Sequence, residues 1–103
     1  MIKVVAVVKA KDGMAREEFL SAWHDEHPAY VRRLPGIRRY TQSPALDHHK
    51  QWPYSGMAEL WFESVADVKT AFDDAAAAEL FAHEEEFLGS VEWFLADEHE
   101  ITL

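Results

Sequence analysis

The sequence predicts an α+β protein with a ferredoxin-like element order, β-α-β-β-α-β, and a four-stranded antiparallel sheet. Two observations lead to this prediction. Four short segments are apolar enough to be buried strands, and two longer segments carry apolar residues at helical spacing. The chain of 103 residues has the length of one domain, so we expect residues 1–103 to form a single domain.

Three of the four predicted strands, the first, the third and the fourth, are largely apolar on both faces. The first, Ile2–Ala10, contains the run Val4–Val8, and the others are Ile37–Gln42, Met57–Phe62 and Val91–Ala96. A strand without a polar face is covered on both sides. Two helices can cover only one face of the sheet. The other face of the sheet needs a partner, and the simplest partner is the sheet of a second copy. We therefore expect a homodimer that forms through the sheet faces.

The first predicted helix, Arg16–Leu34, carries an unusual histidine. His27 lies in the middle of its apolar arc, between Trp23 and Val31 at i±4, and His24 lies at the edge of that arc. Pro28 lacks an N–H and disfavours helical backbone at the residue before it, so a kink is expected at His27. The other interpretation is a core histidine that is satisfied by a backbone partner.

The second half of the chain repeats the pattern of helix and strand. Ser64 is a predicted N-cap, and Val65, Val68 and Phe72 form a buried stripe. A second helical piece around Leu80–Leu88 is expected to have an offset axis and to stop at Gly89. The long connection at residues 43–56 is either a binding loop or a tolerated insertion. The acidic tail, residues 97–103, could extend the last strand.

Composition excludes several functions. Ten basic and 19 acidic residues give a formal charge of −9, which argues against nucleic acid and against an anionic membrane surface. There is no cysteine, so neither disulfides nor thiol chemistry are expected. No secretory pattern or apolar run of membrane-spanning length is present, and a cytoplasmic protein is expected.

Four segments resemble the EthD family of dimeric α+β barrel proteins. They are MIKVVAVVKAKDGM, REEFLSAWHDEHPAYVRRLPGIRRY, SGMAELWFES and EWFLADEHEI, and only the loop at residues 44–54 has no matching pattern. The resemblance implies two ferredoxin-like protomers packed sheet to sheet, each with a pocket between sheet and helices. The superfamily includes polyketide cyclases, cofactor-free monooxygenases, haem-degrading enzymes and lactone isomerases.

The resemblance also implies site residues. Relatives similar to methylmuconolactone methylisomerase use a histidine on the first helix and a tyrosine on the second strand, which match His27 and Tyr40. An acidic residue of the third strand matches Glu59. The cysteine that the isomerase has on this strand falls on Leu60 here, so this chain departs from the isomerase at that position. Fold resemblance does not determine chemistry.

These residues suit proton transfer on a flat ligand. His27 would take up or pass on a proton, and Tyr40 would donate a hydrogen bond to an oxygen that gains charge. The expected substrate-binding residues are Trp23, His24, Tyr30, Glu59, Trp61 and Phe81. Two other interpretations stay open: Tyr40 as a core residue with its hydroxyl at the surface, and Glu59 paired with Arg38 or Arg39.

No metal and no cofactor are expected. His24 and His27 are spaced i, i+3, but a third ligand is missing. Haem binding, by analogy with the superfamily, would use His27, His24 or His83. We expect His48 and His49 in the loop, and His83 and His99 among acidic residues, to face solvent.

Two functions therefore compete. The first is a cofactor-independent proton-transfer enzyme, of isomerase, cyclase or monooxygenase-like type, acting on a small cyclic or aromatic metabolite in a catabolic or polyketide-type pathway. The alternative is a non-catalytic accessory protein that binds a hydrophobic metabolite for an oxidation system. An enzyme requires a proton acceptor and a donor in one pocket, so the relative position of His27 and Tyr40 discriminates between them.

Overall fold

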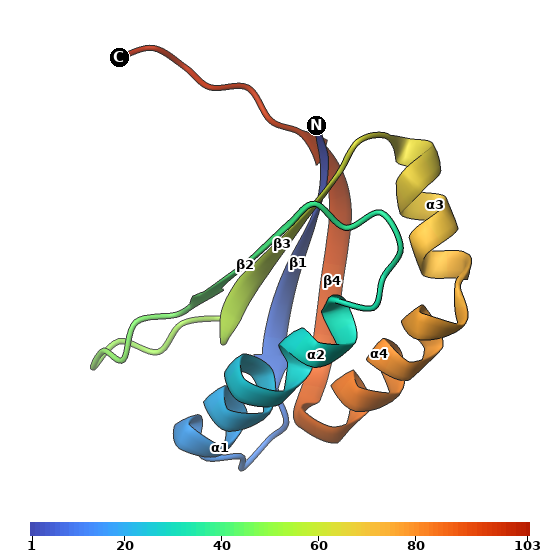
Figure 1. Ribbon diagram of the computed structural model, residues 1–103. Helices are drawn as coiled ribbons and strands as arrows, with labels where there is room; N and C mark the ends of the chain where they lie inside the picture. The colour runs from blue at the N-terminus through green and yellow to red at the C-terminus, as the bar shows by residue number, and fades with distance from the viewer.

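The computed structural model describes residues 1–103 and has two layers, a sheet and a helical layer (Figure 1). The strands are β1 (Ile2–Ala10), β2 (Arg39–Pro44), β3 (Gly56–Phe62) and β4 (Leu88–Asp97). The helical elements are α1 (Arg16–Leu20), η1 (Ser21–Glu26), α2 (His27–Val31), α3 (Val65–Asp73) and α4 (Ala75–Phe87). The strands are antiparallel in the order β2-β3-β1-β4, so the predicted α+β, ferredoxin-like fold is confirmed.

The valine-rich strand β1 lies in the middle of the sheet, between β3 and β4. Val4 pairs with Leu60 and Leu95, and Ala6 pairs with Ala58 and Trp93. Because side chains alternate along a strand, these six residues face the helices together. The register of β1 therefore decides which residues of three strands can line a site beneath the helices.

The first helical segment is continuous but changes its winding. The stretch η1 is a π-helical turn, in which the N–H of His27 donates to the carbonyl of Ala22, five residues earlier. Pro28 follows directly and cannot donate a bond. The predicted disturbance is therefore found on the N-terminal side of Pro28, in the form of a π turn. Such turns frequently occur at functional sites.

The second helical segment is broken at Asp74, where the backbone is extended. Ser64 caps α3 by accepting from the N–H of Asp67 at 3.1 Å, and Asp74 caps α4 by accepting from the N–H of Ala76 at 2.9 Å. The break gives α4 the separate axis that its sequence suggests. The helix ends at Phe87, and β4 begins immediately, earlier than predicted.

The hydrophobic core fills the space between the sheet and the helices. Its largest fully buried side chains are Trp23, Phe62, Phe87 and Val31. Trp23 reaches the sheet at Gly56, where a Cβ atom would come within 2.8 Å of its ring. A residue with a side chain at position 56 would therefore displace the indole.

Strand β4 lies at the edge of the sheet and is poorly covered. Trp93 is 64% exposed and Phe94 is 55% exposed, although they lie on opposite faces of the strand. The chain after β4 leaves the body of the molecule as an extended arm (Figure 1). None of the helices combines the length and hydropathy needed to cross a lipid bilayer.

Candidate functional site

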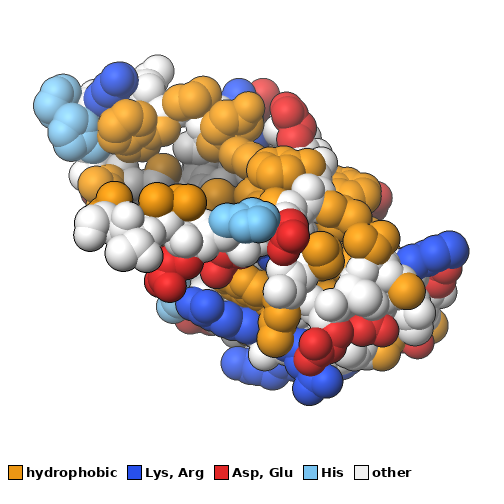
Figure 2. Space-filling view, turned by 90° about the horizontal axis from the view of Figure 1, so that it is seen from above, with side chains coloured by type: hydrophobic (Ala, Val, Ile, Leu, Met, Phe, Trp, Pro, Cys, Tyr) orange, Lys and Arg blue, Asp and Glu red, His pale blue; other side chains and the backbone are white.

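A cavity of about 400 Å³ lies between the sheet and the helices. Of the 20 residues that line it, 16 are hydrophobic, and they come from all four strands and from η1, α2, α3 and α4. Figure 2 shows hydrophobic side chains over much of the face seen from above, with a hollow among them. A mostly apolar cavity of this size with a few polar groups is typical of a small-molecule site.

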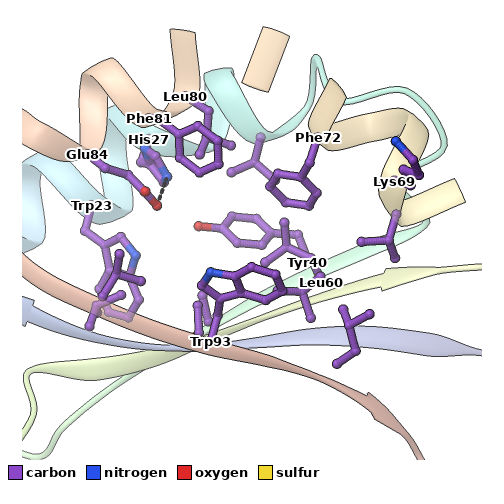
Figure 3. A pocket seen from close by; sticks show the side chains of 18 of the residues that line it. Trp23, His27, Tyr40, Leu60, Lys69, Phe72, Leu80, Phe81, Glu84 and Trp93 are labelled. Atoms are coloured by element: carbon purple, nitrogen blue, oxygen red, sulfur yellow. Dashed lines mark ion pairs between the residues drawn. The ribbon is translucent and has the colours of Figure 1, made fainter. Parts of the chain in front are cut away.

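Two polar side chains from different helices meet in the wall of this cavity. His27 is only 3% exposed, and its Nε2 lies 3.6 Å from Oε2 of Glu84 on α4 (Figure 3). His27 faces inward because its position belongs to the apolar arc of the first helical segment.

Tyr40 enters the cavity from the sheet. Its hydroxyl points toward the side where His27 and Glu84 lie (Figure 3). Burial raises the pKa of Tyr40 to about 12, and the negative charge of Glu84 also raises it. The phenol therefore stays protonated at neutral pH and can act only as a hydrogen-bond donor or acceptor there.

Gln42 determines which of these two roles Tyr40 takes. The amide nitrogen of Gln42 donates to the carbonyl of Trp23 at 2.6 Å and to the hydroxyl of Tyr40 at 2.7 Å. Because a carbonyl can only accept, the orientation of the amide follows from the contact with Trp23. Tyr40 then accepts from Gln42, so its own O–H is free to donate into the cavity.

The proline explains why the carbonyl of Trp23 needs Gln42. In a helix this carbonyl would accept from the N–H of residue 27 or 28. The N–H of His27 goes to Ala22 instead, and Pro28 has none. A buried carbonyl without a partner is costly, and the side chain from β2 fills this vacancy. The same bond ties the first helical segment to the sheet.

His83, which we expected at the surface, is buried, and that expectation was wrong. It is 3% exposed, and its Nδ1 lies 2.8 Å from Nδ1 of His27. A signal for this burial exists in the sequence, because Leu80, His83 and Phe87 are spaced i, i+3, i+7. The acidic neighbours of His83 lie on the other faces of α4.

Two residues of the first helical segment lie outside the cavity lining, unlike their predicted roles. His24 is exposed on the helix surface, and its Nδ1–H donates to Oε1 of Gln42 at 3.0 Å. Tyr30 stacks on the ring of His83, with ring centroids 4.5 Å apart. Each therefore supports a residue near the cavity without lining it. Both positions were assigned to the apolar arc from spacing alone, and the π turn alters that spacing.

Glu59 and Trp61 lie on the opposite face of the sheet, so the expectation that they bind the ligand in this cavity is corrected. Side chains alternate along β3, and Ala58 and Leu60 are the residues of this strand that line the cavity. Glu59 pairs with Lys3 at 2.6 Å, rather than with a neighbouring arginine. Trp61 packs under Arg39, whose guanidinium carbon lies 4.4 Å from its ring centroid.

Several aromatic side chains line the cavity. Phe81, which was predicted, and Phe72 lie with their ring centroids 5.9 Å apart, and Tyr40 extends between these rings and Trp93 (Figure 3). Trp93 was not predicted, because one sequence cannot tell which face of the last strand the helices cover. These flat surfaces suit a planar ligand.

The structure contains no group of three or more histidine, aspartate or glutamate side chains arranged to hold a metal ion. The polar groups of the cavity are instead two helical side chains, His27 and Glu84, a phenol, Tyr40, and the exposed pair of Lys69 and Asp73. The arrangement offers a proton acceptor and a hydrogen-bond donor in an apolar setting.

A four-stranded antiparallel sheet with helices on one face and a pocket between them places the protein in the class of α+β proteins with a ferredoxin-like fold. Within that class, the model of the EthD domain matches residues 11–90. The chain belongs to the EthD family. No curated protein is significantly similar to it in sequence.

Solved structures share the fold at low sequence identity. An EthD family protein from Bacillus halodurans superposes with a TM-score of 0.82 at 15% identity, covering 96% of this chain and 99% of that chain. A dimeric ferredoxin-like protein of unknown function from Bacteroides fragilis gives 0.72 at 16% identity, over 94% and 95%. The cofactor-independent oxygenase SnoaB from Streptomyces nogalater gives 0.70 at 16%, over 97% and 94%. These proteins thus share the fold of this chain, and one of them is an oxygenase.

Proposed function

We propose that this protein is a cofactor-independent enzyme that transfers a proton on a small cyclic or aromatic compound. The observation that carries the proposal is the position of His27 and Tyr40 in the wall of one apolar cavity. One side chain is an imidazole, which can exchange a proton near neutral pH. The other is a phenol that keeps its proton. The oxygenase activity of SnoaB, a cofactor-independent protein with this fold, is compatible with the proposal.

In the proposed reaction, the unprotonated Nε2 of His27 removes a proton from a carbon or oxygen of the ligand. Negative charge develops on the ligand oxygen, and this oxygen accepts a hydrogen bond from the O–H of Tyr40. Glu84 stabilises the imidazolium that forms, because its carboxylate lies 3.6 Å from Nε2. The apolar walls strengthen both interactions by excluding water.

The test uses 1-tetralone, a flat bicyclic ketone with an enolisable carbon, in D₂O. Nuclear magnetic resonance would follow the replacement of hydrogen by deuterium next to the carbonyl. His27→Ala should slow the exchange about 10²–10⁴-fold, because the general base is lost. Tyr40→Phe should slow it roughly 10- to 150-fold, as expected for a hydrogen bond to a charged group worth about 1.5–3 kcal/mol.

A control and a contrary outcome complete this test. His49→Ala changes an exposed loop histidine and should leave the exchange unchanged. Exchange by the wild type at the rate of His27→Ala would contradict the proposal. Quenching of tryptophan fluorescence by 1-tetralone without exchange would favour the alternative, an accessory protein that binds a hydrophobic metabolite. The predominance of apolar residues in the lining supports that alternative.

We further propose that the protein is a homodimer. The exposed apolar residues on both faces of the edge strand β4 support this proposal, and so do the apolar residues Val5, Val7 and Met57 on the face that no helix covers. Exposed edge strands with apolar side chains are normally covered by a partner. The Bacteroides fragilis protein with this fold is described as dimeric.

A further inference from the structure

Two buried histidines form a direct pair behind the cavity. His27 on α2 and His83 on α4 are 56 residues apart in the sequence, and their Nδ1 atoms lie 2.8 Å apart. The rings are nearly parallel, with an interplanar angle of 17°. An N–H···N bond needs one donor and one acceptor, so one proton is shared between the two Nδ1 atoms.

The outer nitrogens of the pair face two different carboxylates. Nε2 of His83 lies 3.4 Å from Oε1 of Glu26, whose side chain is 59% exposed. Nε2 of His27 lies 3.6 Å from Oε2 of Glu84, which lines the cavity. The four side chains thus form a line from solvent to the cavity.

The number of protons on the two neutral imidazoles determines which of their nitrogens can accept another proton. The neutral pair holds two protons, and one of them occupies the bond between the Nδ1 atoms. The second proton can sit on only one of the two Nε2 atoms, so only one carboxylate faces an N–H. The other Nε2 is vacant and can accept a proton.

We propose that the His27–His83 pair is a proton relay that connects the cavity with the surface at Glu26. The inference rests on the proposed function, since it assigns a route to the proton that His27 exchanges with the ligand. The proposal is supported by the contacts that join Glu26 and His27, on the first helical segment, to His83 and Glu84, on α4.

The relay balances in three linked steps. The bond from the ligand to hydrogen breaks as an N–H forms at Nε2 of His27. The N–H at Nδ1 of His27 breaks as one forms at Nδ1 of His83. The N–H at Nε2 of His83 breaks as an O–H forms on the carboxyl of Glu26, which passes the proton to water. The ligand is left with one negative charge, and the reverse sequence returns a proton to it.

Aromatic rings shield the pair from direct contact with water. Tyr30 stacks on His83, and Phe87 contacts both rings with centroids 5.1 and 5.4 Å away. The guanidinium carbon of Arg33 lies 5.3 Å from the ring centroid of Tyr30. Because these aromatic rings surround the pair, a proton passes between the cavity and Glu26 through the two imidazole rings.

The pairing itself can be tested without a substrate. The protein would be labelled with ¹⁵N in its histidine rings, and long-range ¹H–¹⁵N correlation spectra would be recorded at neutral pH. We expect one Nδ1 of the pair to be protonated and the other unprotonated, or both averaged, with a scalar coupling between them. Two protonated or two unprotonated Nδ1 atoms would overturn the proposal. The loss of signals in His83→Gln assigns the pair.

The connection to the surface is tested by Glu26→Gln. Glutamine keeps a hydrogen-bond acceptor but cannot take up a proton, and position 26 is exposed, so the fold should be retained. We expect a larger fraction of molecules to carry the second proton on Nε2 of His27, which faces Glu84, and a smaller fraction to carry it on Nε2 of His83. The matched control, Glu18→Gln, lies on an exposed position of α1 and should change neither ring. An unchanged His27 in Glu26→Gln would overturn the relay.

A kinetic readout separates the relay from the proposed function. In the exchange of 1-tetralone, Glu26→Gln should lower kcat by about tenfold or more with KM unchanged. An unchanged kcat would overturn the relay while leaving His27 as the base. If the wild type shows no exchange, the proposed function fails, and the tautomers of the two rings still decide whether the pair conducts protons to Glu26.

Discussion

At the scale of single residues, Gln42 connects the helical layer with the sheet at the candidate site. Its amide contacts the carbonyl of Trp23, the hydroxyl of Tyr40 and the ring of His24. All three contacts are compatible with one orientation of the amide, in which its nitrogen faces Trp23 and Tyr40 and its oxygen faces His24. The donor role of Tyr40 therefore depends on a residue two positions further along the same strand.

Replacing Gln42 by leucine should destabilise the protein by about 1–3 kcal/mol. The side chain of leucine fills a similar space but leaves the carbonyl of Trp23 without a partner. Urea unfolding, followed by circular dichroism, measures the change in the free energy of unfolding.

The neighbouring residue offers a matched control for Gln42→Leu. The hydroxyl of Thr41 is buried and has no hydrogen-bond partner within the chain. Thr41→Val removes that hydroxyl at nearly constant shape, and should be neutral or slightly stabilising. Equal costs for both variants would show that the bonds of Gln42 do not matter.

At the scale of elements, the first helical segment depends on the combination of a π turn and a proline. The π turn moves the N–H of His27 away from the carbonyl of Trp23, and Pro28 cannot replace it. The segment therefore needs a bond from the sheet, and this bond holds Trp23 and His27 over the cavity.

Replacing Pro28 by alanine should make Gln42 less important. Alanine supplies an N–H that the carbonyl of Trp23 can accept within the helix. In a double-mutant cycle, Gln42→Leu should cost about 1 kcal/mol less in the Pro28→Ala background than in the wild type. The free energies come from the same urea unfolding experiments. Additive costs would refute the link between the proline and Gln42.

At the scale of the whole molecule, light scattering at micromolar concentration should give the mass of a dimer. An interface of standard size would contribute on the order of 20 kcal/mol gross from apolar burial, before the costs of association. Phe94→Glu introduces a charge on the face of the sheet that no helix covers, and should shift the mass to that of a monomer.

A charge on the helical side serves as the control for this shift. Ala82 is exposed on α4, so Ala82→Glu should leave the mass of the dimer unchanged. A monomeric mass for the wild type would contradict the homodimer. Dissociation by both variants would show that added charge, rather than the position of Phe94, causes the effect.

The sequence by itself determined the class of the fold. Short apolar runs, the i, i+4 spacing around His27 and the turn residues between segments are local features, and they predict the order of strands and helices. The same local spacing indicated that His27 and Trp23 face inward. Where a residue lies on its own element is readable from the chain alone.

Only the tertiary structure decided which faces meet. The alternation of β3 allowed either Leu60 or Trp61 to face the helices, and strand pairing with β1 chose Leu60. The acidic surroundings of His83 in the sequence concealed its burial against His27, which depends on how α4 packs on α2. The partners of Gln42 follow from a carbonyl that a π turn leaves free. These contacts join residues far apart in the chain, and local spacing carries no information about such pairs.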